Sequence, residues 1–160
     1  MIEAEIRELS PVPTAAVRLR APTSSLSDLF DEHLPNIAHR LADLGAQPAG
    51  PPYARYHEFG PEEVDVEIGI PVDAPVGALR ALGEAEPGEL GAGELPGGQA
   101  AIAIHRGSYD GLSQTYDQLH EWIHAQGRDE GAAPWESYVD DPSEVQDVAE
   151  LRTEVIWPLP

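Results

Sequence analysis

The sequence contains no cysteine and no lysine. Without cysteine, disulfide bonds and thiolate metal ligands are excluded. All nine basic residues are arginines, set against 29 aspartates and glutamates, and the formal net charge is −20. Such a charge repels phosphate backbones, so we expect no direct binding of DNA or RNA. It favours cationic partners, although excess surface acid also serves solubility alone.

Long apolar runs and targeting patterns are also missing. No run approaches the roughly 20 residues that span a bilayer. Residues 1–5 lack the basic and apolar regions of a signal peptide. With 160 residues, 41% of them hydrophobic, the chain can bury one substantial core. We therefore expect a folded cytoplasmic protein in which residues 1–160 form a single domain that does not contact membranes.

An internal repeat organises the sequence. Gly45 and the segment Tyr53–Tyr56 have counterparts 82 residues later in Gly127 and Trp135–Tyr138. Each half then closes with a strand pattern and a proline, and these closing prolines, Pro71 and Pro158, are 87 residues apart. Three matches in the same order at nearly constant spacing predict a tandem duplication. Module one covers about 1–72, a Gly- and Pro-rich linker or hairpin covers 73–98, and module two covers about 99–160.

Each module has the pattern strand, helix, strand, strand. Apolar side chains at three- and four-residue spacing predict one helix with Phe30, Leu34, Ile37, Leu41 and Leu44, and a second with Leu112, Tyr116, Leu119 and Ile123. Alternation over residues 2–9 predicts an additional strand at a sheet edge. The fold class is therefore α+β. We expect the two modules to be related by a pseudo-twofold axis and to enclose a central cleft.

Several segments resemble the GyrI-like effector-binding family, whose domain is also fused to AraC-type and MerR-type regulators. They are Tyr56–Phe59, Val66–Val72, Leu95–Gly98, His105–Tyr109 and Pro134–Tyr138. The resemblance covers nearly the whole chain, and we expect a stand-alone member because no helix-turn-helix accompanies it. It implies two paired modules around a central pocket for hydrophobic, cationic, drug-like compounds.

The resemblance implies that Glu136 points into this pocket. Strand alternation places Glu136 and Tyr138 on one face and Trp135 on the other. A carboxylate in an apolar, aromatic cleft costs free energy unless a bound cation offsets it, and aromatic rings attract the same cation. The alternative interpretation is an ordinary exposed strand residue.

Further candidate binding residues are aromatic or acidic. Tyr109 is the next choice, because it lies in a strand-to-helix loop and loops frequently carry site residues. Glu67 and Glu154 occupy equivalent places in the closing strands, where a solvated carboxylate is also common. Aromatic residues that can line the pocket, or simply belong to the core, complete the set: Tyr53, Tyr56, Tyr138, Trp135 and Trp157.

Three functions are compatible with these residues. The leading one is a module that binds a small molecule and needs no cofactor. The second follows from stand-alone family members that are similar to hydrolases of cyclopropane-bearing natural products; there Glu136 would be the general base or an electrostatic stabiliser and Tyr109 the proton donor. The third follows from the gyrase-inhibitor members, which bind a protein.

One motif suggests a different chemistry. His120, Glu121 and His124 form an HExxH pattern on a predicted helix, as in zinc proteases, and Glu130 stands where metzincins place their third ligand. Three observations weigh against a zinc protease. The first module has alanines at the two histidine positions, Gly127 is expected to end the helix, and the only methionine is Met1, so no Met-turn exists. We therefore expect no metal site.

Overall fold

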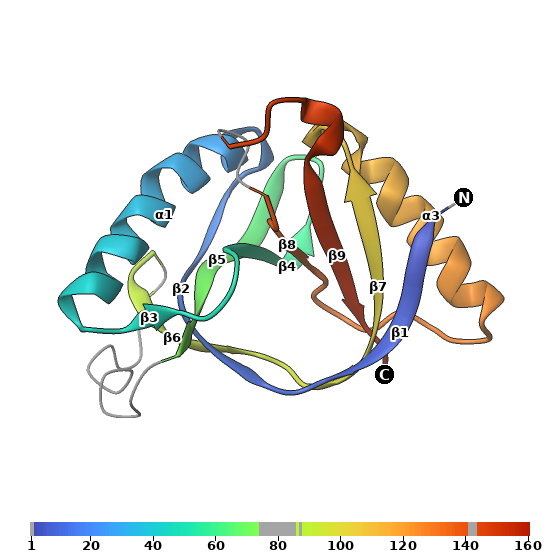
Figure 1. Cartoon of the computed structure of the whole chain (residues 1–160), viewed down its shortest axis with the longest axis horizontal. Coiled ribbons are helices and arrows are strands. Elements are labelled where there is room, and N and C mark those ends of the chain that lie inside the picture. The colour runs from blue at the N-terminus through green and yellow to red at the C-terminus, as the bar shows by residue number, and fades with distance from the viewer. Residues whose placement is uncertain (1, 74–85, 87, 141–143) are drawn as a thin grey trace. The chain divides into compact units, whose positions relative to one another are not determined.

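The computed structural model of the chain describes residues 2–73, 86, 88–140 and 144–160. The chain divides into two units. The N-terminal unit is Pro11–Pro96, and the C-terminal unit combines Met1–Ser10 with Gly97–Pro160. Each unit contains antiparallel strands and one long helix, which confirms the predicted α+β class (Figure 1). Neither described helix combines the length and hydropathy that a bilayer crossing needs.

The sheet of the N-terminal unit has four main strands in the spatial order β4, β5, β2, β6. They are β2 (Val12–Pro22), β4 (Tyr53–Phe59), β5 (Glu63–Asp73) and β6 (Leu90–Leu95). The short strand β3 (Gln47–Pro48) pairs with β5. After β2, a 3-10 turn η1 (Thr23–Ser25) leads into helix α1 (Leu26–Asp43).

The sheet of the C-terminal unit has the matching order β8, β9, β7, β1. Its strands are β1 (Glu3–Leu9), β7 (Gly98–Arg106), β8 (Trp135–Ser137) and β9 (Arg152–Pro158). A 3-10 turn η2 (Tyr109–Gly111) precedes helix α3 (Leu112–Ala125), and another, η3 (Val148–Glu150), precedes β9.

Each helix buries its apolar stripe. Ile37 and Leu41 of α1 are fully buried, as are Leu119 and Ile123 of α3. In the C-terminal unit this stripe packs on Ala101, Ala103 and Val155 of the two central strands. Helix burial is therefore the main source of core stability on this face of the sheet.

The ladder register confirms the duplication. Tyr53 pairs with Gly69 across β4 and β5, while Trp135 pairs with Ile156 across β8 and β9. These pairs preserve both offsets read from the sequence, 82 residues for the first member and 87 for the second. The two units thus share strand order and register, and each follows the predicted sequence of strand, helix, strand and strand.

The repeat also includes a strand that the sequence did not indicate. Residues 90–95, inside the stretch for which a linker was expected, form β6 and pair with β2; residues 74–85 and 87 of that stretch lie outside the described part. Leu95 pairs with Val12, as Leu9 pairs with Gly98. Strands β1 and β6 are therefore equivalent. Strand β1 precedes the first repeat in the chain but pairs in the sheet of the C-terminal unit, and β6 precedes β7 of the second repeat but pairs in the sheet of the N-terminal unit.

Both helices end in the same backbone motif. Gly45 has φ of 69° and Gly127 has φ of 74°, which is the left-handed region that favours glycine. In each case the following residue donates its N–H to the carbonyl five residues before it, Ala46 to Leu41 and Arg128 to Ile123. The prediction that Gly127 ends its helix is confirmed.

These two glycines provide a test of the fold. Gly45→Ala and Gly127→Ala should each lower the free energy of unfolding by about 1–2 kcal/mol, because a Cβ is disfavoured at positive φ. Urea denaturation measures the change, with Ser113→Ala on the exposed side of α3 as the control. Unchanged stability in both glycine variants would contradict the helix ends described here.

Candidate functional site

Glu136 is a buried acid in strand β8, with 5% of its surface exposed. Tyr116 donates a hydrogen bond to its carboxylate at 2.8 Å, and Tyr138 donates another at 2.9 Å. Tyr116 comes from helix α3 and Tyr138 follows β8 directly, so two different segments hold the same carboxylate. Both partners are neutral hydroxyls.

The strand register explains why a helix residue reaches Glu136. Glu136 pairs with Val155 of β9, and Val155 belongs to the core cluster that packs against α3. Directly paired residues point to the same face of a sheet. The carboxylate therefore lies on the face that α3 covers, which places it beside Tyr116.

Burial sets the electrostatics of this group. It raises the pKa of the Glu136 carboxyl above the ordinary value, and the hydrogen bonds from Tyr116 and Tyr138 oppose the rise without cancelling it. No ion pair with an arginine or histidine of the described segments reaches Glu136. The site can therefore gain free energy from any cation that comes close to the carboxylate.

Aromatic rings surround the two tyrosines. Tyr109 meets Tyr138 edge to face with ring centroids 5.7 Å apart, and Trp157 meets Tyr116 in the same way at 5.8 Å. Tyr109 is 40% exposed, whereas Tyr116, Tyr138 and Trp157 are partly buried, so Tyr109 is the most exposed member of the group. The structure thus brings together four of the predicted residues, namely Glu136, Tyr138, Tyr109 and Trp157.

A buried histidine fixes the turn that carries Tyr109. Nε2 of His105 lies 2.7 Å from the carbonyl oxygen of Ser108, to which it must donate, since a carbonyl only accepts. Nδ1 lies 2.7 Å from Oγ1 of Thr115 on α3. His105 therefore ties the end of β7 to both the turn η2 and the helix, and it positions Tyr109 by way of Ser108.

The N-terminal unit has a carboxylate cluster of its own. Glu67 of β5 is 9% exposed, accepts a hydrogen bond from the Tyr53 hydroxyl, and lies 2.9 Å from Nε2 of His57. The Tyr53 hydroxyl also bonds Thr14 at 3.0 Å. Strand alternation places His57 on the face of Tyr53 and Arg55, and Arg55 pairs with Glu67 across β4 and β5.

This second cluster is satisfied internally. Burial opposes ionisation of Glu67, but hydrogen bonds from His57 and Tyr53 outweigh it and hold the pKa of Glu67 below its ordinary value. Burial beside that carboxylate raises the pKa of Tyr53. Close packing is required here, because a Cβ on Gly69 would stand 2.7 Å from the Tyr53 hydroxyl.

Three predicted residues point away from the carboxylate cluster of their own unit. Trp135 is adjacent to Glu136 in β8 and therefore points to the opposite face. Glu154 pairs with Ser137 on that same opposite face. Tyr56 pairs with Val66 and meets the ring of Phe59, away from Tyr53.

Sequence reasoning missed Tyr116, His57 and Thr14 as partners of the two carboxylates. Tyr116 was identified only as part of an apolar helix stripe. One signal was available, since a buried tyrosine hydroxyl usually finds a hydrogen-bond partner. For His57 the available signal was strand alternation, which places it on the same face as Tyr53.

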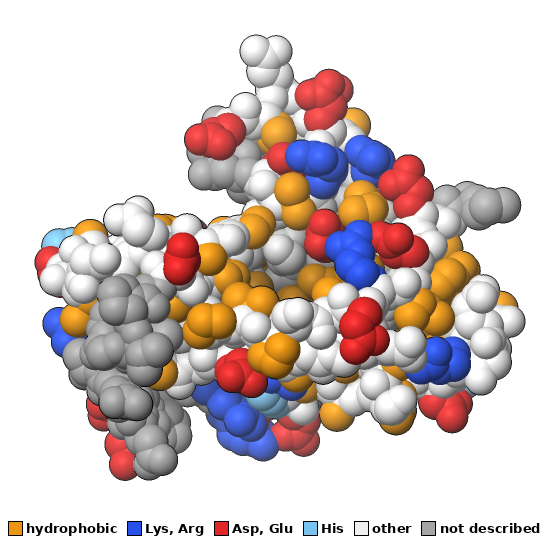
Figure 2. All heavy atoms as spheres, turned by 60° about the horizontal axis from the view of Figure 1, so that its bottom comes forward, with side chains coloured by type: hydrophobic (Ala, Val, Ile, Leu, Met, Phe, Trp, Pro, Cys, Tyr) orange, Lys and Arg blue, Asp and Glu red, His pale blue; other side chains and the backbone are white. Residues whose placement is uncertain are grey.

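The surface charge is dispersed. Acidic side chains are scattered over the face shown in Figure 2, with arginines among them. Several arginines are paired with acids, including Arg18 with Asp65 at 2.9 Å and Arg152 with Asp140 at 2.9 Å. This distribution does not single out a surface patch as the site.

Comparison with known proteins places the chain in a class and then in a family. Over 100% of this chain and 98% of the other, the fold matches that of the EcmrR C-terminal domain, with a TM-score of 0.82 and 26% identity. Residues 2–160 match the GyrI-like small molecule binding domain, and the chain belongs to this family. No curated protein sequence matches it.

Other solved structures extend the comparison. In an EcmrR–DNA complex, the EcmrR chain aligns with a TM-score of 0.80 and 26% identity, and the present chain covers 57% of its length. SAV2435 bound to tetraphenylphosphonium aligns with a TM-score of 0.68 and 12% identity over 99% of this chain and 94% of that one. A hydrolase from Listeria innocua aligns equally well, over 92% of its own length. At 12% identity these likenesses concern the fold alone.

The Glu136 site predicts a pH-dependent effect on stability. Because its folded pKa is raised, Glu136 contributes stability that is present below about pH 4.5 and lost as the pH rises through the folded pKa. Glu136→Gln mimics the protonated form and should gain stability relative to wild type from pH 4 to pH 7. Urea denaturation across this range tests it, with the exposed Glu121→Gln as control. A constant difference between variant and wild type would refute the assignment.

Glu67 should behave in the opposite way. The pKa of Glu67 is lower in the folded state than in the unfolded state. Its contribution to folding stability is therefore present when the pH is above the ordinary glutamate pKa, and it is lost as the pH falls through the folded pKa. Glu67→Gln should cost about 1–3 kcal/mol at pH 7, and the cost should shrink toward pH 3. The exposed Glu94→Gln in β6 is the matched control. A cost that grows on acidification would contradict this account.

Proposed function

We propose that the chain binds a hydrophobic organic cation at Glu136, with Tyr109, Tyr116, Tyr138 and Trp157 as the aromatic surroundings. The observation that supports this most directly is a carboxylate that is 5% exposed and whose hydrogen-bond donors, among the described residues, are two tyrosine hydroxyls. The family is one of small-molecule-binding domains, and the proposal adds the class of ligand.

Electrostatics favour a cation over a neutral or anionic ligand. The two hydroxyls that bind Glu136 carry no charge, and together with the attraction of nearby His105 they do not offset the cost of burying the ionised carboxylate. A ligand cation supplies a charged partner. The tyrosine and tryptophan rings add cation–π attraction and accommodate apolar substituents around the charge.

The second carboxylate cluster has a different role. Glu67 already pairs with His57 and binds Tyr53, so a ligand cation would have to displace an internal partner. We assign Glu67 and Tyr53 to the stabilisation of the N-terminal unit. Glu136 is then the residue that contacts the charge of the ligand.

A structural neighbour supplies the probe. The structure of SAV2435 contains bound tetraphenylphosphonium, a bulky aromatic cation of the kind proposed here. Isothermal titration of the present protein with tetraphenylphosphonium should show binding. Glu136→Gln should weaken it by about 30- to 5,000-fold, which corresponds to ~2–5 kcal/mol for loss of one partner of a buried charge pair.

A neutral ligand provides the matched comparison. Triphenylphosphine oxide presents similar aromatic groups without a net charge, and its affinity should change less than about threefold in Glu136→Gln. Glu154→Gln, a half-buried acid on the opposite face of β9, should leave both affinities unchanged. Equal losses for the cation and the neutral compound would show that Glu136 acts through shape rather than charge.

A hydrolase is the second candidate, and one feature of the site favours it. A carboxyl whose pKa is raised and which touches tyrosine hydroxyls is a stronger base than an ordinary glutamate and can exchange protons with its surroundings. In this reaction Glu136 takes a proton from water, the oxygen of that water bonds to a cyclopropane carbon, and the ring C–C bond breaks. The released carbon receives a proton from Tyr138 or from the neighbouring Tyr109.

Mass spectrometry distinguishes the two functions. Incubation with a cyclopropane-bearing electrophile should leave it intact if the protein only binds. Conversion to a product heavier by one water, abolished in Glu136→Gln, would establish the hydrolase instead.

A further inference from the structure

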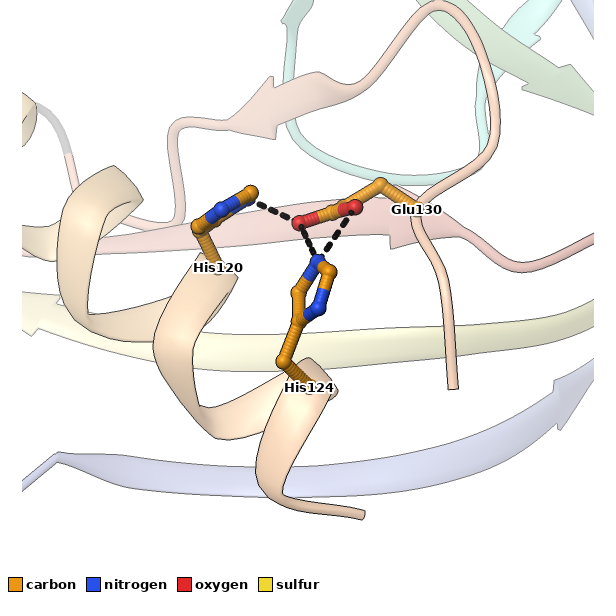
Figure 3. Close-up of side chains that lie close together, drawn as sticks. All are labelled: His120, His124 and Glu130. Carbon is orange, nitrogen blue, oxygen red and sulfur yellow. Dashed lines mark hydrogen bonds and ion pairs between the residues drawn. The ribbon is translucent and has the colours of Figure 1, made fainter. Parts of the chain in front are cut away.

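Helix α3 ends beside a cluster that the small-molecule site does not use. His120 and His124 lie one turn apart on α3, and Glu130 reaches them from the segment between α3 and β8 (Figure 3). Nε2 of His124 lies 3.0 Å from each carboxylate oxygen of Glu130, and Nδ1 of His120 contacts the same carboxylate. One imidazole nitrogen from each histidine and one carboxylate oxygen of Glu130 lie within 4.8 Å of one another.

We infer that His120, His124 and Glu130 form a binding site for a divalent transition metal of the zinc type. Two imidazoles and one carboxylate are the ligands that Zn²⁺ accepts, with a fourth position left to water. Zn²⁺ bonds of about 2.0–2.2 Å place ligand atoms roughly 3.3 Å apart in a tetrahedron. The His124–Glu130 separation is already close to that value, and small rotations of exposed side chains can bring the rest into range.

The backbone around Glu130 holds it in this position. Gly127 takes a left-handed conformation that ends α3 and turns the chain back. Gly131 then donates its N–H to the carbonyl of Pro158 at 2.7 Å, and its own carbonyl accepts a bond from Nε1 of Trp157 at 3.0 Å. A Cβ on Gly131 would stand 2.7 Å from the Pro158 oxygen. The third ligand is thus fixed to the end of β9 before any metal binds.

The arguments that weighed against a zinc protease do not exclude metal binding. Absence of a Met-turn excludes a metzincin catalytic site but not coordination. The first module has Ala38 and Ala42 at the equivalent helix positions, so the fold itself does not need the histidines. Gly127 does end the helix, and that turn is what returns Glu130 to His124.

Both histidines are accessible to a metal in solution. Their side chains are 55% and 48% exposed, whereas Glu130 is 16% exposed. A bound ion would connect α3 to the segment that enters β8. Helix α3 carries Tyr116, and the segment leads into the strand of Glu136; His120 also lies with its ring centroid 6.3 Å from that of Trp157, so the ion would brace the framework of the small-molecule site.

Zinc titration of untagged protein freed of metal tests the inference. Competition with a chromophoric chelator should show one Zn²⁺ per chain, and Zn²⁺ should raise the thermal midpoint. Each of three substitutions should lower the Zn²⁺ affinity at least about 100-fold: His120→Ala, His124→Ala and Glu130→Gln. Loss of a residue that only hydrogen-bonds to a metal ligand already lowers metal affinity by about 10- to 100-fold, and loss of a ligand itself should cost more. His39→Ala, at an exposed histidine of α1, is the control and should change nothing.

Three results would overturn the inference. One is the lack of stoichiometric Zn²⁺ binding to wild type. Another is an unchanged affinity in Glu130→Gln, which would leave only a weak pair of surface histidines. The third is an equal loss in His39→Ala, which would indicate general binding to exposed histidines. Circular dichroism of each variant confirms that the exposed substitutions leave the fold intact.

Discussion

The packing of an amphipathic helix on one face of a short antiparallel sheet is the constraint from which the site follows. In the C-terminal unit, Leu119 and Ile123 of α3 cover Val155 of β9. Glu136 pairs directly with Val155, so the helix that buries the core also buries this carboxylate. The same helix supplies Tyr116 as its hydrogen-bond donor. Core packing and the acid–tyrosine cluster are therefore consequences of one arrangement.

Duplication gives the two units the same strand order and register, but their buried carboxylates stand at different positions. By the ladder register, Glu136 occupies the place of Ala54, because each pairs with the equivalent residue of its neighbouring strand. The N-terminal unit instead has Glu67, which faces away from that position and is paired with His57. One copy has a carboxylate that contacts a histidine and a tyrosine, and the other has a carboxylate held by two tyrosine hydroxyls. This divergence is what makes the C-terminal unit the candidate binding unit.

Much of the fold could be predicted from the sequence because each half of the repeat supports the elements assigned in the other half. The 82- and 87-residue offsets reappear in the strand register, and the glycines expected to end the helices have positive φ. Strand β6 escaped prediction because its glycine-rich sequence has little strand propensity and is ordered by pairing with β2. The partners of Glu136 and Glu67 escaped it for a different reason. Tyr116 reaches its carboxylate through helix packing, and His57 reaches Glu67 through the pairing register of β4 with β5, and both are tertiary features.

The central claim is that Glu136 carries the charge that recognises a cationic ligand. The most direct measurement is a titration of its side-chain carboxyl carbon by NMR, with and without saturating tetraphenylphosphonium. Without ligand, burial should hold the pKa of Glu136 above the ordinary value. With the cation bound, the pKa should fall, because the ligand stabilises the ionised form. A Glu136 pKa that does not respond to a saturating cation would contradict the account.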